Sequence, residues 1–193
     1  FWIVAWRHQV EVADYPRTAD RMAAILTHGV MPKGAAWPAP HPLQLSADDG
    51  ASPGSPELFL RAATCLINEE GYHGASVERI SAKLNVSKGA FYHHNETKDE
   101  LVAACFQRTF DVMWRAIHAA EAAGGSGLQV LVSAVSALVE HQIRGSAPLL
   151  RTSALSAVPI AFRNELMQRF DRISYRFASI LCDGIAAGAL DSI

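Results

Sequence analysis

The spacing of apolar residues along the chain predicts an almost entirely α-helical protein. Hydrophobic residues recur at intervals of three and four from end to end, whereas the alternation expected of a strand is nearly absent. The first long helix is expected to open near Tyr15 and Pro16 and to end near Gly29. One of its faces carries an apolar stripe to bury: Ala19, Met22, Ala23, Leu26 and Val30.

Three more long helices are expected in the C-terminal half. They run from Leu101 into Ile117, from Leu128 to Ile143, and from Ala161 to about Ala187. Pro148 and Pro159 bracket a short or broken helix, the kind of place where the mouth of a pocket can form.

A change of composition separates the first helix from the rest of the chain. Residues 34–55 are rich in Gly, Pro, Ala and Ser, which favours neither helix nor sheet, and we expect a mobile linker there. Ser55, Pro56 and Glu57 then supply an N-cap, a proline at the first helical position and an early acid. A new domain is therefore expected to begin at residue 56.

Residues 57–104 have the pattern of a helix-turn-helix. Gly71-Tyr72, Ala75-Ser76-Val77 and Ile80-Ser81 mark the start of a second helix, and Leu84-Asn85-Val86 form the turn after it. The segment from Val86 to His94 then places small, cationic and aromatic side chains on one short helix, as a recognition helix requires.

This stretch resembles the TetR/AcrR family of bacterial transcriptional regulators. The resemblance implies an all-α fold, in which a three-helix DNA-binding head with the helix-turn-helix is followed by a helical body for ligand binding and dimerisation. It rests on Ala62-Ala63, Gly71-Tyr72, Ser76-Val77, Ile80, Val86-Ser87-Lys88-Gly89, Phe91-Tyr92-His93-His94, Lys98 and Glu100-Leu101.

Small residues and hydrogen-bond donors are what a helix needs to enter the major groove, which is about 12 Å wide. Ser87, Lys88, Gly89 and Ala90 combine both at the start of the recognition helix, where free backbone N–H groups also favour a phosphate. Tyr92 and His93 can reach phosphates or base edges, and Lys98 can neutralise a phosphate. The resemblance implies DNA contacts at Ser76, Lys88, Tyr92, His93 and Lys98.

Two residues depart from the family pattern. Arg79 replaces a common acid and is predicted to add a phosphate contact, and Asn95 stands where an aromatic packing residue is usual. Some of the same positions also have structural explanations. Ser76 caps a helix with or without DNA, Thr97 and Glu100 form a capping box, and Phe91, Ile80 and Leu84 suit the core.

In the family the helical body often encloses a small-molecule pocket, and ligand binding shifts the population of two arrangements of the heads. Core packing is an alternative explanation for each candidate taken singly. The candidate ligand-binding residues are Phe110, Trp114, His118, His141, Leu150, Leu155, Phe162, Met167 and Phe170.

The order of the blocks suggests a fragment of a tandem protein. Residues 1–33 resemble the closing helices of a preceding TetR-like body, residues 34–55 form the linker, and residues 56–104 form the DNA-binding domain. Residues 105–193 would be a ligand-binding body that lacks its last helices, and the start of the chain is expected to be truncated. A circularly permuted arrangement is the alternative.

Composition is consistent with a cytoplasmic globular protein that crosses no membrane. No apolar run reaches the roughly 20 residues of a membrane span, and the N-terminus lacks the features of a signal peptide. Cys65, Cys105 and Cys182 are expected to be reduced thiols buried on helices. The formal net charge is −2, so DNA attraction must be local, and between Ser76 and Lys98 cations outnumber acids.

The function expected is that of a ligand-responsive transcriptional regulator, usually a repressor, that binds an inverted-repeat DNA operator as a homodimer and needs no cofactor. An enzyme using His118, Glu121, Glu140 and His141 is a weaker alternative, because no nucleophile and base have defined roles. A metal site is not expected, because adjacent histidines such as His93 and His94 point about 100° apart on a helix. An interaction module that has lost DNA binding is the third alternative.

Overall fold

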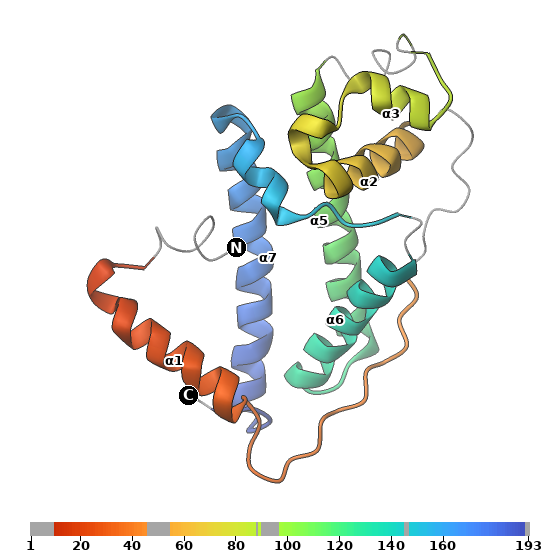
Figure 1. The fold of residues 1–193 in the computed structure, drawn as a ribbon. Coiled ribbons are helices and arrows are strands. Elements are labelled where there is room, and N and C mark those ends of the chain that lie inside the picture. Colours follow the sequence, from red (N-terminus) through yellow and green to blue (C-terminus); the bar gives the residue numbers. More distant parts are fainter. Residues whose placement is uncertain (1–9, 46–54, 88, 90–96, 145–146, 192–193) are drawn as a thin grey trace.

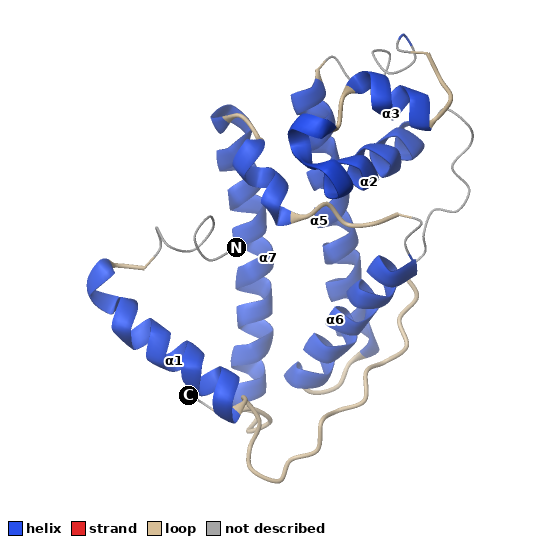
Figure 2. Ribbon diagram, in the orientation of Figure 1, coloured by secondary structure: helices blue, strands red, loops and turns tan. Residues whose placement is uncertain are grey.

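The computed structural model describes residues 10–45, 55–87, 89, 97–144 and 147–191, and within those ranges the chain is all-α, as predicted (Figures 1 and 2). The long helices predicted from apolar spacing are present with nearly the expected bounds. The elements are η3 (Val12–Asp14), α1 (Tyr15–His28), α2 (Pro56–Gly74), α3 (Val77–Lys83), α5 (Lys98–Ala123), α6 (Gly127–Arg144), η4 (Thr152–Ala157) and α7 (Ile160–Ala186).

Local sequence explains where several helices begin and end. Pro56 occupies the first turn of α2, where its missing N–H costs nothing. The side chain of Thr97 accepts from the backbone of Glu100 while the Glu100 side chain accepts from Thr97, so the predicted capping box is confirmed. Gly124 ends α5 with φ 78°, a conformation that glycine adopts without strain. Pro148 and Pro159 bracket the short 3₁₀ helix η4, as expected.

One continuous hydrophobic core joins α2 and α3 to the bundle of α5, α6 and α7. Phe59 and Ile80 are fully buried in the same cluster as the aromatic side chains of the bundle. There the Phe170 ring meets the Phe110 ring edge-on, with 4.7 Å between centroids, and Phe106 lies 6.1 Å from Phe170. Helix α5 crosses residue 104, so the expected end of the DNA-binding domain lies inside a helix.

Helices α6 and α7 approach each other closely at a glycine. A Cβ atom at Gly127 would lie 2.4 Å from the carbonyl oxygen of Ile180 and 2.8 Å from the backbone nitrogen of Gly184. Both of these neighbours are backbone atoms and cannot move aside as the end of a side chain can. Glycine at position 127 is therefore what lets the two backbones come together.

The linker differs from the expectation over residues 39–45. Leu45 is buried against Val112, Ala116 and Ala137, so this stretch packs on α5 and α6. Its backbone is also held, because the His41 N–H donates to Ser133 Oγ at 2.9 Å. The expectation of a mobile linker was wrong here, because an extended segment carrying apolar side chains can cover apolar positions on two helices.

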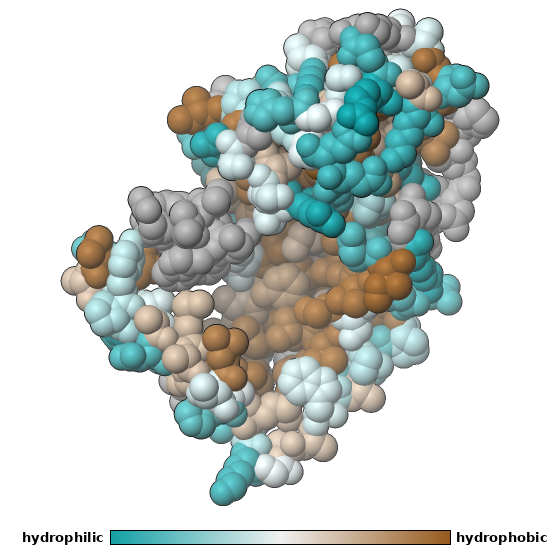
Figure 3. Space-filling view, in the orientation of Figure 1, coloured by the Kyte–Doolittle hydropathy of each residue, from teal (hydrophilic) through white to brown (hydrophobic). Residues whose placement is uncertain are grey.

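Helix α1 forms as predicted, but its apolar stripe is not buried. Met22 is 46% exposed and Leu26 is 84% exposed, and α1 buries none of its residues. Helix α1 diverges from α7 in Figure 1. Just after the helix, Val30 and Met31 pack against Leu128, Val132 and Leu190, and the Asp191 N–H donates to the Val30 carbonyl at 3.0 Å. Hydrophobic surface is concentrated in the middle of the face in Figure 3, below the largely hydrophilic head.

The three cysteines are free, as expected, but they are not equally buried. Cys105 is buried, and burial raises the pKa of its thiol to about 12. Cys65 is half-buried and Cys182 is exposed, so the expectation of three buried thiols was wrong for Cys182. None of the described helices combines the length and hydropathy that crossing a membrane requires.

Candidate functional site

The turn between α3 and the segment after it has the geometry of a helix-turn-helix. Asn85 has φ 55°, in the left-handed region that asparagine tolerates better than most residues. The Val86 N–H donates to the Ser81 carbonyl at 3.0 Å, which closes the turn. At the other end of α3, Ser76 Oγ accepts from the Arg79 backbone at 3.3 Å, so the predicted cap is confirmed.

The segment expected to enter the DNA groove is described only in part. Ser87 follows the turn, and Gly89 is in helical conformation. Among the described residues, an added Cβ at Gly89 would meet Ser87 Oγ, at 3.7 Å. Outside the described residues lie Lys88, Ala90, Phe91, Tyr92, His93, His94 and Asn95.

Two cations of α3 are paired with acids at the end of α2. The Arg79 guanidinium binds both carboxylate oxygens of Glu70, and Lys83 Nζ lies 3.5 Å from Glu69. The excess of cations over acids expected from the sequence was counted only between Ser76 and Lys98, so it did not include these two glutamates. Folding brings them onto the same face, so the basic character of this face is lower than the sequence suggested.

Lys98 holds the start of α5 against the end of α2. Its ammonium donates to the carbonyl oxygen of Tyr72 and lies over the Tyr72 ring, 4.2 Å from the centroid. The Tyr72 hydroxyl in turn donates to Asp99. Burial, followed by the hydrogen bond and charge of Asp99, raises the pKa of Tyr72 to about 12, and burial lowers the pKa of Lys98. Lys98 therefore has a structural role.

A buried arginine joins the head to the bundle. Arg108 on α5 is 9% exposed, and its Nε donates to Glu57 of α2 at 2.8 Å. Its other nitrogens donate to the carbonyls of Ala147 and Pro148 at 3.0 and 2.9 Å. Burial raises the pKa of Glu57, but hydrogen bonds from Arg61 and Arg108 lower it further, so the pKa lies below the ordinary 4.5.

Residues 147–151 lie between α6 and η4, and we call them the junction segment. Side chains of α2 and α5 hold this segment through hydrogen bonds. Asn68 of α2 donates to the Leu149 carbonyl at 2.8 Å and accepts from the Arg151 backbone at 2.9 Å. The Leu150 N–H donates to Thr109 of α5 at 2.9 Å. The junction segment thus touches the head and the bundle at once.

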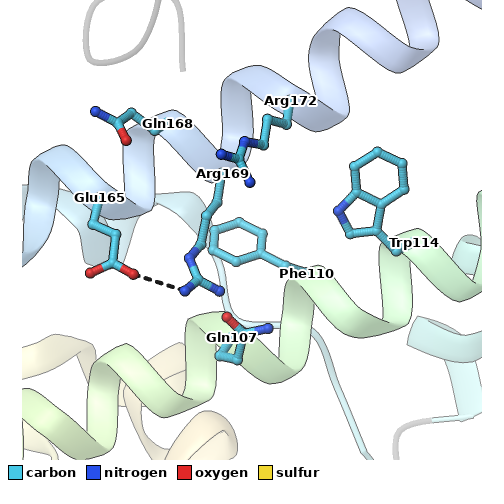
Figure 4. Close-up of a pocket in the computed structure, with 7 residues that line it drawn as sticks. All are labelled: Gln107, Phe110, Trp114, Glu165, Gln168, Arg169 and Arg172. Carbon is cyan, nitrogen blue, oxygen red and sulfur yellow. Dashed lines mark hydrogen bonds and ion pairs between the residues drawn. The ribbon is translucent and has the colours of Figure 1, made fainter.

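An open cleft of about 410 Å³ lies between α5 and α7 (Figure 4). Phe110 and Trp114 rise from α5, whereas Arg169 reaches down from α7 into the space between the helices and Arg172 lines the cleft along α7. A second hollow of about 230 Å³ shares Gln107, Glu165 and Arg169 with this cleft. The volume of the larger one is in the range of small-molecule sites.

Comparison with known proteins agrees with the helix-turn-helix geometry. The family of bacterial regulatory proteins named tetR matches residues 59–105. The chain is 40% identical over 52 residues to the Transposon Tn10 TetC protein of Escherichia coli, over 27% of this chain and 26% of that protein. It is 27% identical over 135 residues to the HTH-type transcriptional repressor DhaR of Mycobacterium sp. (strain GP1), 68% of each.

A solved structure extends the similarity into the bundle. A bacterial regulatory protein in the tetR family from Rhodococcus RHA1 superposes with TM-score 0.58 at 26% identity, over 69% of this chain and 70% of that one. Residues 59–105 therefore match the DNA-binding region of the tetR family, and the bundle has a fold similar to that of a regulatory protein of this family. The matched residues include α2, α3 and the start of α5, and the bundle consists of α5, α6 and α7.

The bundle of α5, α6 and α7 brings some of the candidate ligand residues together and separates others. Phe110 and Trp114 line the α5–α7 cleft, and Phe162 lines the second hollow. His118 stacks on Trp114 with 5.4 Å between centroids, just outside the lining. The other candidates lie in or against the hydrophobic core: Leu150, Leu155, Met167 and Phe170.

His141 lies away from the cleft and holds the junction segment. Its Nε2 is 2.9 Å from the Ala147 carbonyl, so this nitrogen donates. The other residues considered for enzyme chemistry have salt-bridge partners: Glu121 pairs with Arg176 at 2.6 Å, and Glu140 pairs with Arg144.

Polar residues of the cleft were missed from the sequence. They are Gln107, Glu165, Gln168, Arg169 and Arg172. In sequence they look like an ordinary solvated helix face. The sequence feature that could have identified the arginines of the cleft is their spacing on α7. Arg169, Arg172 and Arg176 recur at intervals of three and four residues, which places them on one face of the helix.

Proposed function

We propose that this protein is a sequence-specific repressor of the TetR family that binds an inverted-repeat operator as a homodimer and releases it when a small molecule occupies the α5–α7 cleft. Residues 56–104 form the DNA-binding domain in this proposal, and residues 105–193 form the ligand-binding body. The repressor role is supported by the similarity to DhaR, which is named a transcriptional repressor.

The observation that carries the proposal is the helix-turn-helix geometry. The left-handed Asn85 and the Ser76 cap set the direction of the chain into Ser87 and Gly89. Such a turn presents the next helix to the major groove. The residues proposed to contact DNA are Ser76, Arg79, Ser87, Lys88, Gly89, Ala90, Tyr92, His93 and Lys98.

The junction segment supports coupling between ligand and DNA. It contacts α2 through Asn68 and α5 through Thr109, and α5 also forms one wall of the cleft. A ligand that moved α5 relative to α7 would therefore act on contacts that hold the head. Coupling of this kind is a shift between two populated arrangements, and it requires that the ligand bind one of them better.

Selection of the purified chain on a random duplex DNA pool at moderate salt tests the proposal. Two variants are selected in parallel: Tyr92→Ala in the proposed recognition helix, and Tyr15→Ala on α1 as a control with the same chemical change. We expect the wild type and Tyr15→Ala to enrich an inverted repeat and Tyr92→Ala to enrich nothing.

Other outcomes would count against separate parts of the proposal. Enrichment of a single half-site would contradict the homodimer, because a dimer reads two half-sites related by two-fold symmetry. Equal enrichment by Tyr92→Ala would contradict the recognition helix, and failure of the wild type to enrich any sequence would contradict sequence-specific binding.

A further inference from the structure

The α5–α7 cleft contains a cation that the fold leaves uncommitted. Three arginines follow one another along α7. Arg169 pairs with Glu165 at 2.8 Å, and Arg176 pairs with Glu121 at 2.6 Å. Arg172 lies between them and, within the described part of the chain, makes no hydrogen bond or ion pair. It lines the cleft, and in Figure 4 its guanidinium lies along α7 on the side of Phe110.

The net positive charge of the cleft lining favours a negatively charged ligand. The lining holds Arg169, Arg172 and one acid, Glu165, so its formal charge is +1. Because Glu165 is already bound to Arg169, an incoming anion finds its free partner at Arg172. A planar guanidinium binds a carboxylate through two parallel hydrogen bonds. A single uncompensated charge suits a singly charged carboxylate better than a doubly charged phosphate.

The rest of the cleft is suited to an apolar group. Next to Arg172 the wall is formed by the rings of Phe110 and Trp114. Beyond Gln107, the second hollow is lined mainly by apolar side chains: Ala103, Ala104, Phe162 and Leu166. The two hollows share three residues, so one extended molecule can occupy both.

We infer that the α5–α7 cleft binds an organic monocarboxylate with an apolar chain, with the carboxylate on Arg172 and the chain directed toward Ala104 and Leu166. This inference deepens the effector part of the proposed function and rests on it only for the regulatory role of the ligand. Binding itself follows from the charge and shape of the cleft and does not require DNA.

Calorimetric titration of the full chain without DNA tests the inference. The probes are decanoate and decan-1-ol, which share one alkyl chain and differ in the head group. We expect the wild type to bind decanoate about tenfold more tightly than decanol, the difference that a charged hydrogen-bonded pair typically contributes. Comparable affinity for the two probes, or no binding of decanoate, would overturn the inference.

Three variants locate the probe. Arg172→Gln should weaken decanoate binding about tenfold and leave decanol binding unchanged. Ala104→Phe, which fills the apolar hollow, should weaken both probes. Arg144→Gln makes the same charge change on α6, outside the cleft, and should alter neither. Unchanged decanoate binding by Arg172→Gln would overturn the assignment, provided that thermal melting shows each variant to be folded.

A separate measurement distinguishes this inference from the proposed function. The affinity of the chain for its selected operator is measured with and without decanoate. If decanoate binds through Arg172 and operator affinity does not change, the cleft is a carboxylate site and the effector mechanism is wrong. If the operator is bound and decanoate is not, the DNA-binding proposal stands and the cleft assignment fails.

Discussion

Arg108 and His141 are single residues whose buried hydrogen bonds hold the junction segment, and Arg108 also joins it to the head. Arg108 connects Glu57 of α2 to the carbonyls of Ala147 and Pro148, and all of these contacts lie in a largely buried region. His141 donates to the same Ala147 carbonyl from α6. Buried polar groups of this kind hold a unique arrangement, because every one of them must find a partner when water is excluded.

Replacement of Arg108 by Met should destabilise the fold by roughly 3 kcal/mol or more. The variant leaves Glu57 without one of its two arginine partners, leaves the Pro148 carbonyl without its donor, and leaves the Ala147 carbonyl with His141 alone. Urea unfolding followed by circular dichroism measures the loss. Arg144→Met, which breaks an exposed pair with Glu140 within α6, is the control and should change the unfolding midpoint little.

His141 should make stability fall as the pH drops below about 6.5. Burial lowers the pKa of His141 below its ordinary 6.5, the hydrogen bond to Ala147 opposes this, and the charges of Arg108, Arg115 and Arg61 add to the lowering. The unfolded chain therefore takes up a proton near pH 6.5 that the folded chain does not. The stability contributed by His141 is complete above pH 6.5 and is lost progressively as the pH falls.

Thermal melting between pH 7.5 and 5.5 tests the role of His141. In His141→Gln, which keeps a hydrogen-bond donor but cannot be protonated in this range, the melting temperature should vary less with pH than in the wild type. His118→Gln removes an exposed histidine on α5 and should retain the wild-type dependence. An identical pH dependence in His141→Gln and the wild type would show that another group titrates.

At the scale of elements, the contact between α2 and α3 determines how much of the positive charge on α3 is free to attract DNA. Helix α3 carries Arg79 and Lys83, and the end of α2 places Glu70 and Glu69 against them. A phosphate that approaches Arg79 must compete with a carboxylate that already holds the guanidinium through both of its oxygens. The α2–α3 contact thus supports the helix-turn-helix and also limits its positive potential.

Replacement of Glu70 by Gln should strengthen operator binding several-fold. The variant frees Arg79 for a phosphate and removes an acid close to the proposed DNA face. The slope of log affinity against log salt should become steeper by about one, because one more phosphate is neutralised. Fluorescence anisotropy over a range of salt concentrations measures both effects.

The control for this experiment is Glu140→Gln, which makes the same charge change on α6, outside the helix-turn-helix. It should leave the salt slope unchanged. If Glu140→Gln strengthens binding as much as Glu70→Gln does, the effect comes from net charge and not from release of Arg79.

At the scale of the whole molecule, residues 39–45, which precede the helix-turn-helix, pack on the body. Leu45 fills an apolar site formed by Val112, Ala116 and Ala137. The Gln129 side chain also donates to the Ala39 carbonyl, at 3.3 Å. Residues 39–45 therefore cover α5 and α6, whereas α1 extends away from the bundle (Figure 1).

Replacement of Leu45 by Ala should release residues 39–45 from the body. The loss of buried side-chain contact is expected to cost about 2 kcal/mol, at the low end for a buried leucine because Leu45 lies near the surface. Limited proteolysis should then cut this segment faster than in the wild type. Leu26→Ala on α1 truncates an 84% exposed leucine and should leave both stability and this cleavage rate unchanged.

Local structure could be predicted from the amino-acid sequence alone, and so could the resemblance of residues 59–105 to the tetR family. Apolar spacing placed α5, α6 and α7, capping residues placed the start of α5, and the motif around Val86 indicated the helix-turn-helix. These features depend on residues within a few positions of one another. Hydrogen bonding and apolar spacing within one helix are therefore enough to predict them.

Contacts between residues far apart in the sequence became known from the folded structure. It paired Glu70 with Arg79, brought Arg108 to the junction segment, and left Arg172 facing a cleft across from Trp114. It also buried Leu45 and left the stripe of α1 exposed, although both are apolar in sequence. A pattern along one helix shows which face is apolar or charged. The packing of the other helices determines what that face contacts, and no local spacing encodes that choice.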